Sequence, residues 1–389
     1  MDKKPVKINV EGKIDYENAA AFKESILQKI AGQDDVQVEL DMAGVSFISS
    51  AGLRALLQIN HSVQKLTLTS VNPDIYEIFQ ITGLTELISV RKEYRTISVE
   101  GCKLIGEGFN GKIYKIDPEK VVKVYKDPSA LDEILHEREM ARLAMILGVP
   151  TAISYEVVRA GDSYGAVFEL LDAKTFSSIL AESPEQTDWC VREYTDLLKK
   201  VHGTVVPEGR LPSANKLVRK WIRGIQDCLP RDSFEKLDRM IEAVPERGTM
   251  LHGDCHTNNV VLAGDEVLLI DMDTLAVGHP IFEMAQMYGT YVGFGESNPD
   301  VIQGFLGISA SAAGEFWKRS LRRYLDTDED RVSAVEQKIR CVAYTRLIDW
   351  SRRHRDPDDA ASRTERELWI RELTELIDEV DSLDFDVSG

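Results

Sequence analysis

The chain has 389 residues and a formal charge of −18 at pH 7, from 47 Lys and Arg against 65 Asp and Glu. This acidic balance argues against a protein that coats nucleic acid or an anionic membrane. Hydrophobic residues make up 43% and charged residues 29%, as in ordinary globular proteins, which argues against wholesale disorder.

Three sequence features predict a cytoplasmic protein. No apolar run approaches the roughly 18 residues that a membrane span needs, so we expect no transmembrane segment. The N-terminal stretch has lysines but no apolar run after them, so we expect no secretory signal. The 5 cysteines are scattered without a C-x-x-C pair, which argues against a disulfide framework or a structural zinc site.

Residues 1–94 alternate between strand patterns and helix patterns. Apolar and polar residues alternate in VKINV and VQVEL, whereas the segment between them has apolar residues at helical spacing. The expected strands cover 6–10, 36–40, 65–70 and 86–90, and the expected helices cover 18–32, 49–64 and 72–84. This order predicts one small α/β domain, a sheet with helices on one side.

The segment LDMAGVSFISSAGLRALL at 40–57 and the ending PDIYEIFQITGLTELISV resemble a STAS domain, the fold of bacterial anti-sigma factor antagonists. The resemblance implies that an anti-sigma factor or another protein is a partner. It also implies that Ser50, at the strand-to-helix turn, is a phosphorylation target. From the residues alone, Ser49 and Ser50 are also suited to cap a helix, where a phosphate would add about −1.5 to −2 charges.

The second segment begins with glycines in G-x-G-x-x-G spacing, Gly106, Gly108 and Gly111. Strand patterns follow in KIYKI and in VVKVYK, so the glycines lie in a predicted hairpin. A glycine loop between antiparallel strands covers the nucleotide phosphates in protein kinases. Lys123, in the second strand, could then reach the phosphate oxygens. The alternative is a flexible hairpin with an exposed lysine.

An amphipathic helix is expected over 132–151, ended by a glycine and a proline. Either Glu137 or Glu139 could pair with Lys123. The alternative is that both are solvated charges on the helix face, and we favour this for Glu139. The apolar strand AVFELLD at 166–172 could form the hinge between two lobes, where backbone groups meet an adenine edge. The candidate hinge positions are Phe168, Glu169, Leu170 and Leu171.

The strongest signal lies in LHGDCHTNNVVL at 251–262 and VLLIDMDTLAVGHP at 267–280. Asp254 and Asn259 have the spacing of the kinase catalytic loop, and Asp271 ends an apolar strand. The apolar runs between them flank a glycine and predict a hairpin. Asn and Asp oxygens are suitable magnesium ligands, and Asp254 would lie near the acceptor hydroxyl and take its proton.

The H-G-D-x-H-x-x-N motif, followed by a strand ending in I-D, resembles the aminoglycoside and choline phosphotransferase family, which is related to protein kinases. The resemblance covers 95–389 and implies a two-lobed α+β kinase-like domain. The implied N-lobe is 95–170, and the implied C-lobe, 171–389, is largely helical. ATP and Mg²⁺ are the implied cofactors, with an unknown hydroxyl compound as acceptor.

The same resemblance implies a role for each matching residue. Asp254 is the base, Asn259 and Asp271 bind magnesium, and Lys123, paired with Glu137, binds the phosphates. The implied supporting residues are His252 and His256, which buttress the loop, and Asp273, which assists a metal. Glu283 stands where the family often has Asp.

A zinc hydrolase is a competing interpretation, with His252, Asp254 and His256 as ligands. It leaves Lys123, Glu137 and the glycine loop unexplained.

The regions 185–249 and 281–389 have apolar residues at helical spacing. The resemblance implies that helices here frame the acceptor pocket. Candidate pocket residues are Tyr344, Arg346, Asp349 and Trp350, with a packed helix as the alternative. Residues 356–389 carry 12 acidic and 3 basic side chains, which could attract a cationic acceptor or form a solvated tail.

Three functions follow from these features. The first is a phosphotransferase acting on a small molecule, with the STAS module regulating or localising it. The second is a signalling protein kinase that phosphorylates Ser50 or a STAS partner. The third is an anti-sigma factor antagonist-type binding protein whose kinase-like segment senses ATP.

Overall fold

The computed structural model describes residues 5–32, 36–108, 110–170 and 173–385. Its contacts divide the chain into two compact units. Unit 1 comprises Met1–Gly101, Val124–Lys126 and Val157–Gly165, and unit 2 comprises Cys102–Lys123, Asp127–Glu156 and Ala166–Gly389.

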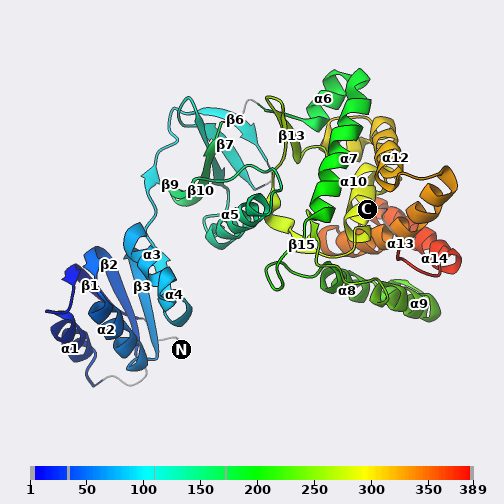
Figure 1. Cartoon of the computed structure of the whole chain (residues 1–389). Coiled ribbons are helices and arrows are strands. Elements are labelled where there is room, and N and C mark those ends of the chain that lie inside the picture. The colour runs from blue at the N-terminus through cyan, green and yellow to red at the C-terminus, as the bar shows by residue number, and fades with distance from the viewer. Residues whose placement is uncertain (1–4, 33–35, 109, 171–172, 386–389) are drawn as a thin grey trace. The chain divides into compact units, whose positions relative to one another are not determined.

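The N-terminal part of unit 1 is built on a four-stranded parallel sheet (Figure 1). Its strands, in spatial order, are β1 (Val6–Ile14), β2 (Gln37–Ile48), β3 (Lys65–Val71) and β4 (Ser89–Lys92). Every second residue of β2 is buried from Val38 to Met42, while the residues between them are partly exposed. One face of the sheet is therefore in the core, which agrees with helices on one side.

The helices of this part are α1 (Ala19–Lys29), α2 (Ser50–His61), α3 (Pro73–Ile81) and α4 (Leu84–Leu87). Side chains cap the starts of α2 and α3, where Ser49 accepts from the Gly52 N–H and Asn72 accepts from the Ile75 N–H at 3.0 Å. The strand expected over 86–90 starts later, because the Ile88 N–H donates to the Leu84 carbonyl and closes the short helix α4.

The chain continues into a six-stranded sheet of order β5-β9-β10-β8-β7-β6. The strands are β5 (Thr96–Ile97), β6 (Lys103–Glu107), β7 (Gly111–Lys115), β8 (Lys120–Tyr125), β9 (Glu156–Ala160) and β10 (Ser163–Glu169). Since β5 pairs with β9, Thr96 lies opposite Arg159, and this pairing explains why part of β9 belongs to unit 1.

Helix α5 (Leu131–Ile146) follows β8. After it, the Leu269 N–H donates to the Pro150 carbonyl at 2.9 Å, and Thr151 forms a bridge with Leu269. This contact connects the sheet region to the strand that leads to Asp271.

The remainder of unit 2 is mainly helical, in agreement with the expected C-lobe (Figure 1). The helices are α6 (Phe176–Glu182), η1 (Pro184–Gln186), α7 (Thr187–Gly203), α8 (Ala214–Gly224), η2 (Gln226–Cys228), α9 (Arg231–Glu242), η3 (Met272–Thr274), α10 (Ile281–Tyr291), η4 (Gly293–Gly295), α11 (Asp300–Leu306), α12 (Ala310–Leu325), α13 (Glu329–His354) and α14 (Ala360–Glu379). Their buried faces form one continuous apolar core that includes Trp317 and Trp369.

Two small sheets carry the segment with the strongest sequence signal. One has the order β11 (Ala173–Thr175), β13 (Val260–Ala263) and β14 (Glu266–Leu269). The other pairs β12 (Met250–Leu251) with β15 (Ala276–Val277). β13 and β14 are antiparallel, as the two apolar runs around Gly264 predict.

Candidate active site

The 252–259 loop joins β12 to β13 and carries several of the predicted site residues. The β13–β14 hairpin returns the chain to this loop, where the Ile270 N–H donates to the Asn259 carbonyl at 3.0 Å. The hairpin therefore places Asn259 beside the segment that begins with Asp271.

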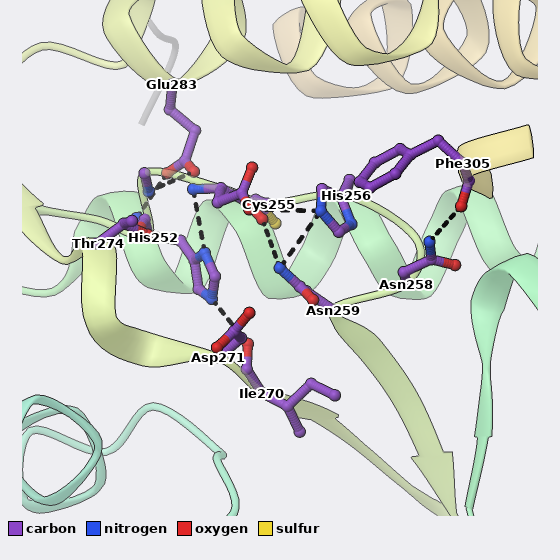
Figure 2. A network of polar contacts seen from close by, with 12 residues as sticks. His252, Cys255, His256, Asn258, Asn259, Ile270, Asp271, Thr274, Glu283 and Phe305 are labelled. Atoms are coloured by element: carbon purple, nitrogen blue, oxygen red, sulfur yellow. Dashed lines mark hydrogen bonds and ion pairs between the residues drawn. The ribbon is translucent and has the colours of Figure 1, made fainter. Parts of the chain in front are cut away.

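The buried carboxylate of Glu283, on α10, holds the start of this loop (Figure 2). It accepts hydrogen bonds from the His252 N–H at 2.7 Å and the Gly253 N–H at 2.9 Å. It also lies 3.1 Å from His202 Nε2. Burial raises the pKa of Glu283, but the interactions with His202 and His252 outweigh burial, so the pKa lies below its usual value. The ionised carboxylate thus accepts from three donors.

We expect Glu283→Gln to destabilise this region by about 2–4 kcal/mol at neutral pH, because glutamine offers one acceptor oxygen to three donors. The pKa of Glu283 in the folded protein lies below its ordinary value of 4.5. The contribution of Glu283 to the free energy of unfolding is therefore complete above pH 4.5 and is lost as the pH falls through the pKa of the folded protein. Thermal unfolding of both proteins across this range should show a lower free energy of unfolding for Glu283→Gln than for wild type at pH 7, and the difference should become smaller in acid. Equal stability of both proteins at pH 7 would contradict the role of Glu283.

Gly253 allows the loop to pass close to the Asp271 segment. Its φ is +85°, and a Cβ there would lie 2.3 Å from the Thr274 carbonyl oxygen. The Thr274 hydroxyl in turn donates to the His252 carbonyl at 2.8 Å. A side chain at position 253 would therefore separate the two segments.

His252 links the loop to the Asp271 segment through both ring nitrogens (Figure 2). The Asp254 N–H donates to Nδ1 at 3.3 Å, so this nitrogen accepts, and Nε2 donates to the Ile270 carbonyl at 3.2 Å. In this arrangement His252 positions backbone on both sides of the site and has no free nitrogen for a zinc ion. No group of three His, Cys, Asp or Glu side chains within the described residues could hold a metal ion.

Asp254 projects from the middle of the loop and is partly exposed. Burial raises its pKa, but the hydrogen bond and charge of His256 and the charge of Arg346 outweigh burial, so the pKa lies below the usual value. His256 Nε2 lies 3.4 Å from the Asp254 carboxylate. The Asn259 Nδ2 donates to the Asp254 carbonyl at 3.0 Å, which orients the amide. Asp254 therefore presents an ionised carboxylate whose position is held by His256.

Asp271 has the left-handed φ of +64°, an unusual conformation for a residue other than glycine. Its carboxylate lies 3.8 Å from Lys123 Nζ. Lys123 Nζ also donates to both Glu137 oxygens at 3.2 Å, while Glu139 lies beside Arg210. Residues from β8, α5 and the segment that follows β14 thus meet at one place.

Helix α5 also contacts the residues after Asp271, where His136 Nε2 lies 3.1 Å from the Asp273 carbonyl. Burial, followed by the nearby carboxylates of Asp271 and Glu137, raises the pKa of Asp273 to about 6. The carboxylates of Asp271 and Glu137 contribute to this shift after burial, and a bound divalent cation would offset their charge. Oxygen ligands at Asp271 and at the Asn259 amide suit magnesium.

The glycines of the predicted phosphate loop lie in the β6–β7 hairpin. Gly106 is paired opposite Ile113 within the sheet, and the Gly108 N–H donates to the Gly111 carbonyl at 2.9 Å across the turn. At the predicted hinge, Glu169 ends β10 and is exposed, and the Leu170 N–H donates to the Glu119 carbonyl. Phe168 is half-buried in β10, and Leu171 lies outside the described residues.

A cavity of about 290 Å³ opens beside Asp254. Its lining includes Arg346 and Trp350 of α13, and it also includes Phe294 and Phe305. Of the other pocket candidates, Tyr344 is buried and donates to Glu296, and Asp349 pairs with Arg353, so neither is part of this lining. The two phenylalanines were not predicted, because their helices gave no signal of which face meets the cavity.

Comparison with known families identifies both parts of the chain. Residues 101–335, more than half of the chain, match the model of the phosphotransferase enzyme family, and residues 2–98 match that of the STAS domain. The chain belongs to the phosphotransferase enzyme family. The predicted resemblance, a STAS domain followed by an aminoglycoside phosphotransferase-like domain, is therefore confirmed.

Solved structures share the phosphotransferase fold. Aminoglycoside phosphotransferase APH(4)-Ia is 11% identical, with 71% of this chain and 93% of that chain covered and a TM-score of 0.50. A thermostable mutant of it in complex with AMP-PNP and hygromycin B is 12% identical over the same shares, also at 0.50. ADP-bound APH(2'')-Ib is 14% identical over 77% and 98%, with a TM-score of 0.48. At these identities the first two matches show the fold alone, and this confirms the predicted fold class.

In the STAS domain, Ser50 is the first residue of helix α2 and is exposed. The cap is the preceding Ser49, whose hydroxyl accepts from the Gly52 N–H at 3.4 Å. The Ser50 hydroxyl therefore lies at the positive end of a helix without serving as its cap.

The helices of this phosphotransferase include none that is long and apolar enough to cross a membrane, as far as the described residues extend.

Proposed function

We propose that this chain is an ATP- and magnesium-dependent phosphotransferase that transfers the γ-phosphoryl group to a hydroxyl of a small molecule. In this proposal residues 95–389 carry catalysis and residues 1–94 form a regulatory or interaction module. The convergence of Lys123, Glu137 and Asp271, next to the loop that presents Asp254, supports it best. These groups provide phosphate binding, charge neutralisation and a proton acceptor in one place.

The chain's own residues have distinct tasks in this reaction. Glu137 holds the Lys123 ammonium, which binds the α- and β-phosphate oxygens of ATP. Asp254 orients the acceptor hydroxyl and takes its proton as the oxygen attacks the γ-phosphorus. The new bond joins that oxygen to phosphorus, the bond between the γ-phosphorus and the bridging oxygen breaks, and ADP leaves with the bond's electron pair.

Asn259 and Asp271 would hold magnesium through an amide oxygen and a carboxylate. Bound magnesium supplies positive charge that neutralises the phosphate oxygens. His252 and Glu283 fix the loop and so hold Asp254 and Asn259 in position. Asp273 would support the cation site, and His256 would orient the Asp254 carboxylate. Positioning and charge neutralisation are the main sources of rate in this chemistry.

A second candidate is a protein kinase that phosphorylates Ser50 in its own chain, in another copy or in a STAS partner. The exposed position of Ser50 at the start of α2 favours it, since a phosphate there is accessible and changes the charge of a docking surface. In a third candidate the STAS domain binds an anti-sigma factor and the kinase-like domain only senses ATP.

One labelling experiment separates these candidates. The full chain is incubated with γ-³²P-labelled ATP, Mg²⁺ and a set of hydroxyl metabolites, with Ser50→Ala as a matched variant. We expect label in a small molecule from both proteins. Label on the wild-type protein that disappears in Ser50→Ala would favour the second candidate, and the absence of any transfer would favour the third.

A further inference from the structure

The cavity beside Asp254 is lined by more basic than acidic side chains, although the protein as a whole is acidic. The titratable side chains in its lining are Asp254, Arg346 and Arg355. Phe294, Phe305 and Trp350 supply aromatic walls, and Phe294 packs edge-on against Trp350 at 4.9 Å between ring centroids. The cavity therefore combines two guanidinium groups with an apolar interior.

The two arginines differ in their partners. Arg355 lies 3.5 Å from the buried Glu365 carboxylate and 5.4 Å over the Trp350 ring. Arg346 is half-buried, and among the described residues it has no hydrogen bond and no ion pair within 4.0 Å. Its one ring contact is with Trp221, at 5.9 Å. Arg346 thus lacks a directly paired anion, and the carboxylate of Asp254, which lines the same cavity, acts on it only at longer range.

A guanidinium group that is withdrawn from water and lacks an anion is costly, and an oxyanion that enters the cavity offsets this cost. Carboxylates and phosphates match its planar fork with two parallel hydrogen bonds. Burial lowers the pKa of Arg346, although the charge of Asp254 raises it, which agrees with an incompletely neutralised cation. A polycationic acceptor would face repulsion from Arg346 and Arg355 together.

We propose that the phosphoryl acceptor carries a carboxylate or phosphate group on a small apolar or aromatic body, with the anion at Arg346 and the hydroxyl at Asp254. This deepens the proposed function and rests on it. It also replaces the cationic acceptor suggested by the acidic stretch 356–389. Carboxylates of that stretch, Glu365 and Glu372, are paired with Arg355 and Arg340.

Binding without ATP tests the anion site independently of catalysis. The probes are 4-hydroxybenzoate, phenyl phosphate, the neutral 4-hydroxybenzyl alcohol and the cationic tyramine, each titrated into the full chain by calorimetry. We expect at least one anionic probe to bind about 10-fold or more tighter than the neutral alcohol, and tyramine to bind most weakly. The anionic probe that binds more tightly shows whether the acceptor carries a carboxylate group or a phosphate group. Tightest binding by tyramine or the alcohol, or no binding by either anion at millimolar concentration, would overturn the proposal.

Variants assign the preference to one side chain. Arg346→Met should remove the preference for anions, and Arg346→Lys should retain part of it. Arg352→Met, on the same helix but outside the cavity lining, should keep all of it. An anion preference that survives in a folded Arg346→Met protein would overturn the assignment.

Kinetics distinguish an acceptor site from a site for the transferred phosphoryl group. With the acceptor found by labelling, Arg346→Met should raise the acceptor KM about 10-fold or more and leave the KM for ATP unchanged. A fall in kcat alone, with the acceptor KM unchanged, would show that Arg346 acts on the γ-phosphoryl group and would overturn the proposal. A chain that binds the anionic probes but transfers no phosphate would instead refute the proposed function.

Discussion

Asp254→Asn should lower kcat by about 10²–10⁴, the usual contribution of a general base. The asparagine keeps the size of the side chain but cannot take the proton of the acceptor hydroxyl. The loop itself should stay in place, because its backbone is held by Glu283 and its Asn259 amide donates to the carbonyl of residue 254 rather than to the carboxylate. Steady-state turnover of the acceptor measures the effect.

Asp265→Asn is the matched control for this variant. Asp265 is exposed in the turn of the β13–β14 hairpin, close in sequence to the site, and should leave kcat unchanged. ATP binding should also be similar in Asp254→Asn and wild type. Turnover of Asp254→Asn within a factor of about two of wild type would rule out Asp254 as the base.

Asp271→Asn should remove the magnesium-dependent part of ATP binding, a change of roughly 100-fold in Kd. The substitution takes away the charge of a carboxylate that lies 3.8 Å from Lys123 Nζ, and it replaces the proposed charged magnesium ligand with a neutral one. Asparagine tolerates the left-handed backbone at this position, so the fold should survive. Calorimetric titration of ATP, once with Mg²⁺ and once with EDTA, separates metal-dependent from metal-independent binding.

Asp326 provides the matched control, since it is exposed and also has a left-handed φ, of +47°. Asp326→Asn should bind ATP like wild type under both conditions. An Asp271→Asn protein whose Kd still falls on addition of Mg²⁺, as it does in wild type, would show that magnesium is held elsewhere.

Local patterns in the sequence predicted the elements that carry the site. The two apolar runs around Gly264 form a hairpin, and alternating apolar residues such as Val38 and Leu40 form the buried face of the STAS sheet. These successes have a common cause, because strand and helix periodicity depends on residues close together in the chain. The strand expected over 86–90 was misplaced, since Leu84 and Ile88 close a helical turn there.

Long-range contacts could not be predicted in the same way. Glu283 reaches back about 30 positions to the His252 and Gly253 amides, and His202 joins it from a different helix. Nothing in the local pattern distinguishes such a carboxylate from a solvated one. Likewise, Phe305 lines the cavity only because of how α11 packs, which depends on the tertiary structure.

The most direct test is a crystal structure of the full chain with Mg²⁺ and a non-hydrolysable ATP analogue. We expect the metal on the Asn259 amide oxygen and the Asp271 carboxylate, Lys123 on the α- and β-phosphates, and the γ-phosphorus facing Asp254. An analogue bound away from Lys123 and Asp271, or a γ-phosphate directed away from Asp254 with the loop unchanged, would contradict phosphoryl transfer at this site.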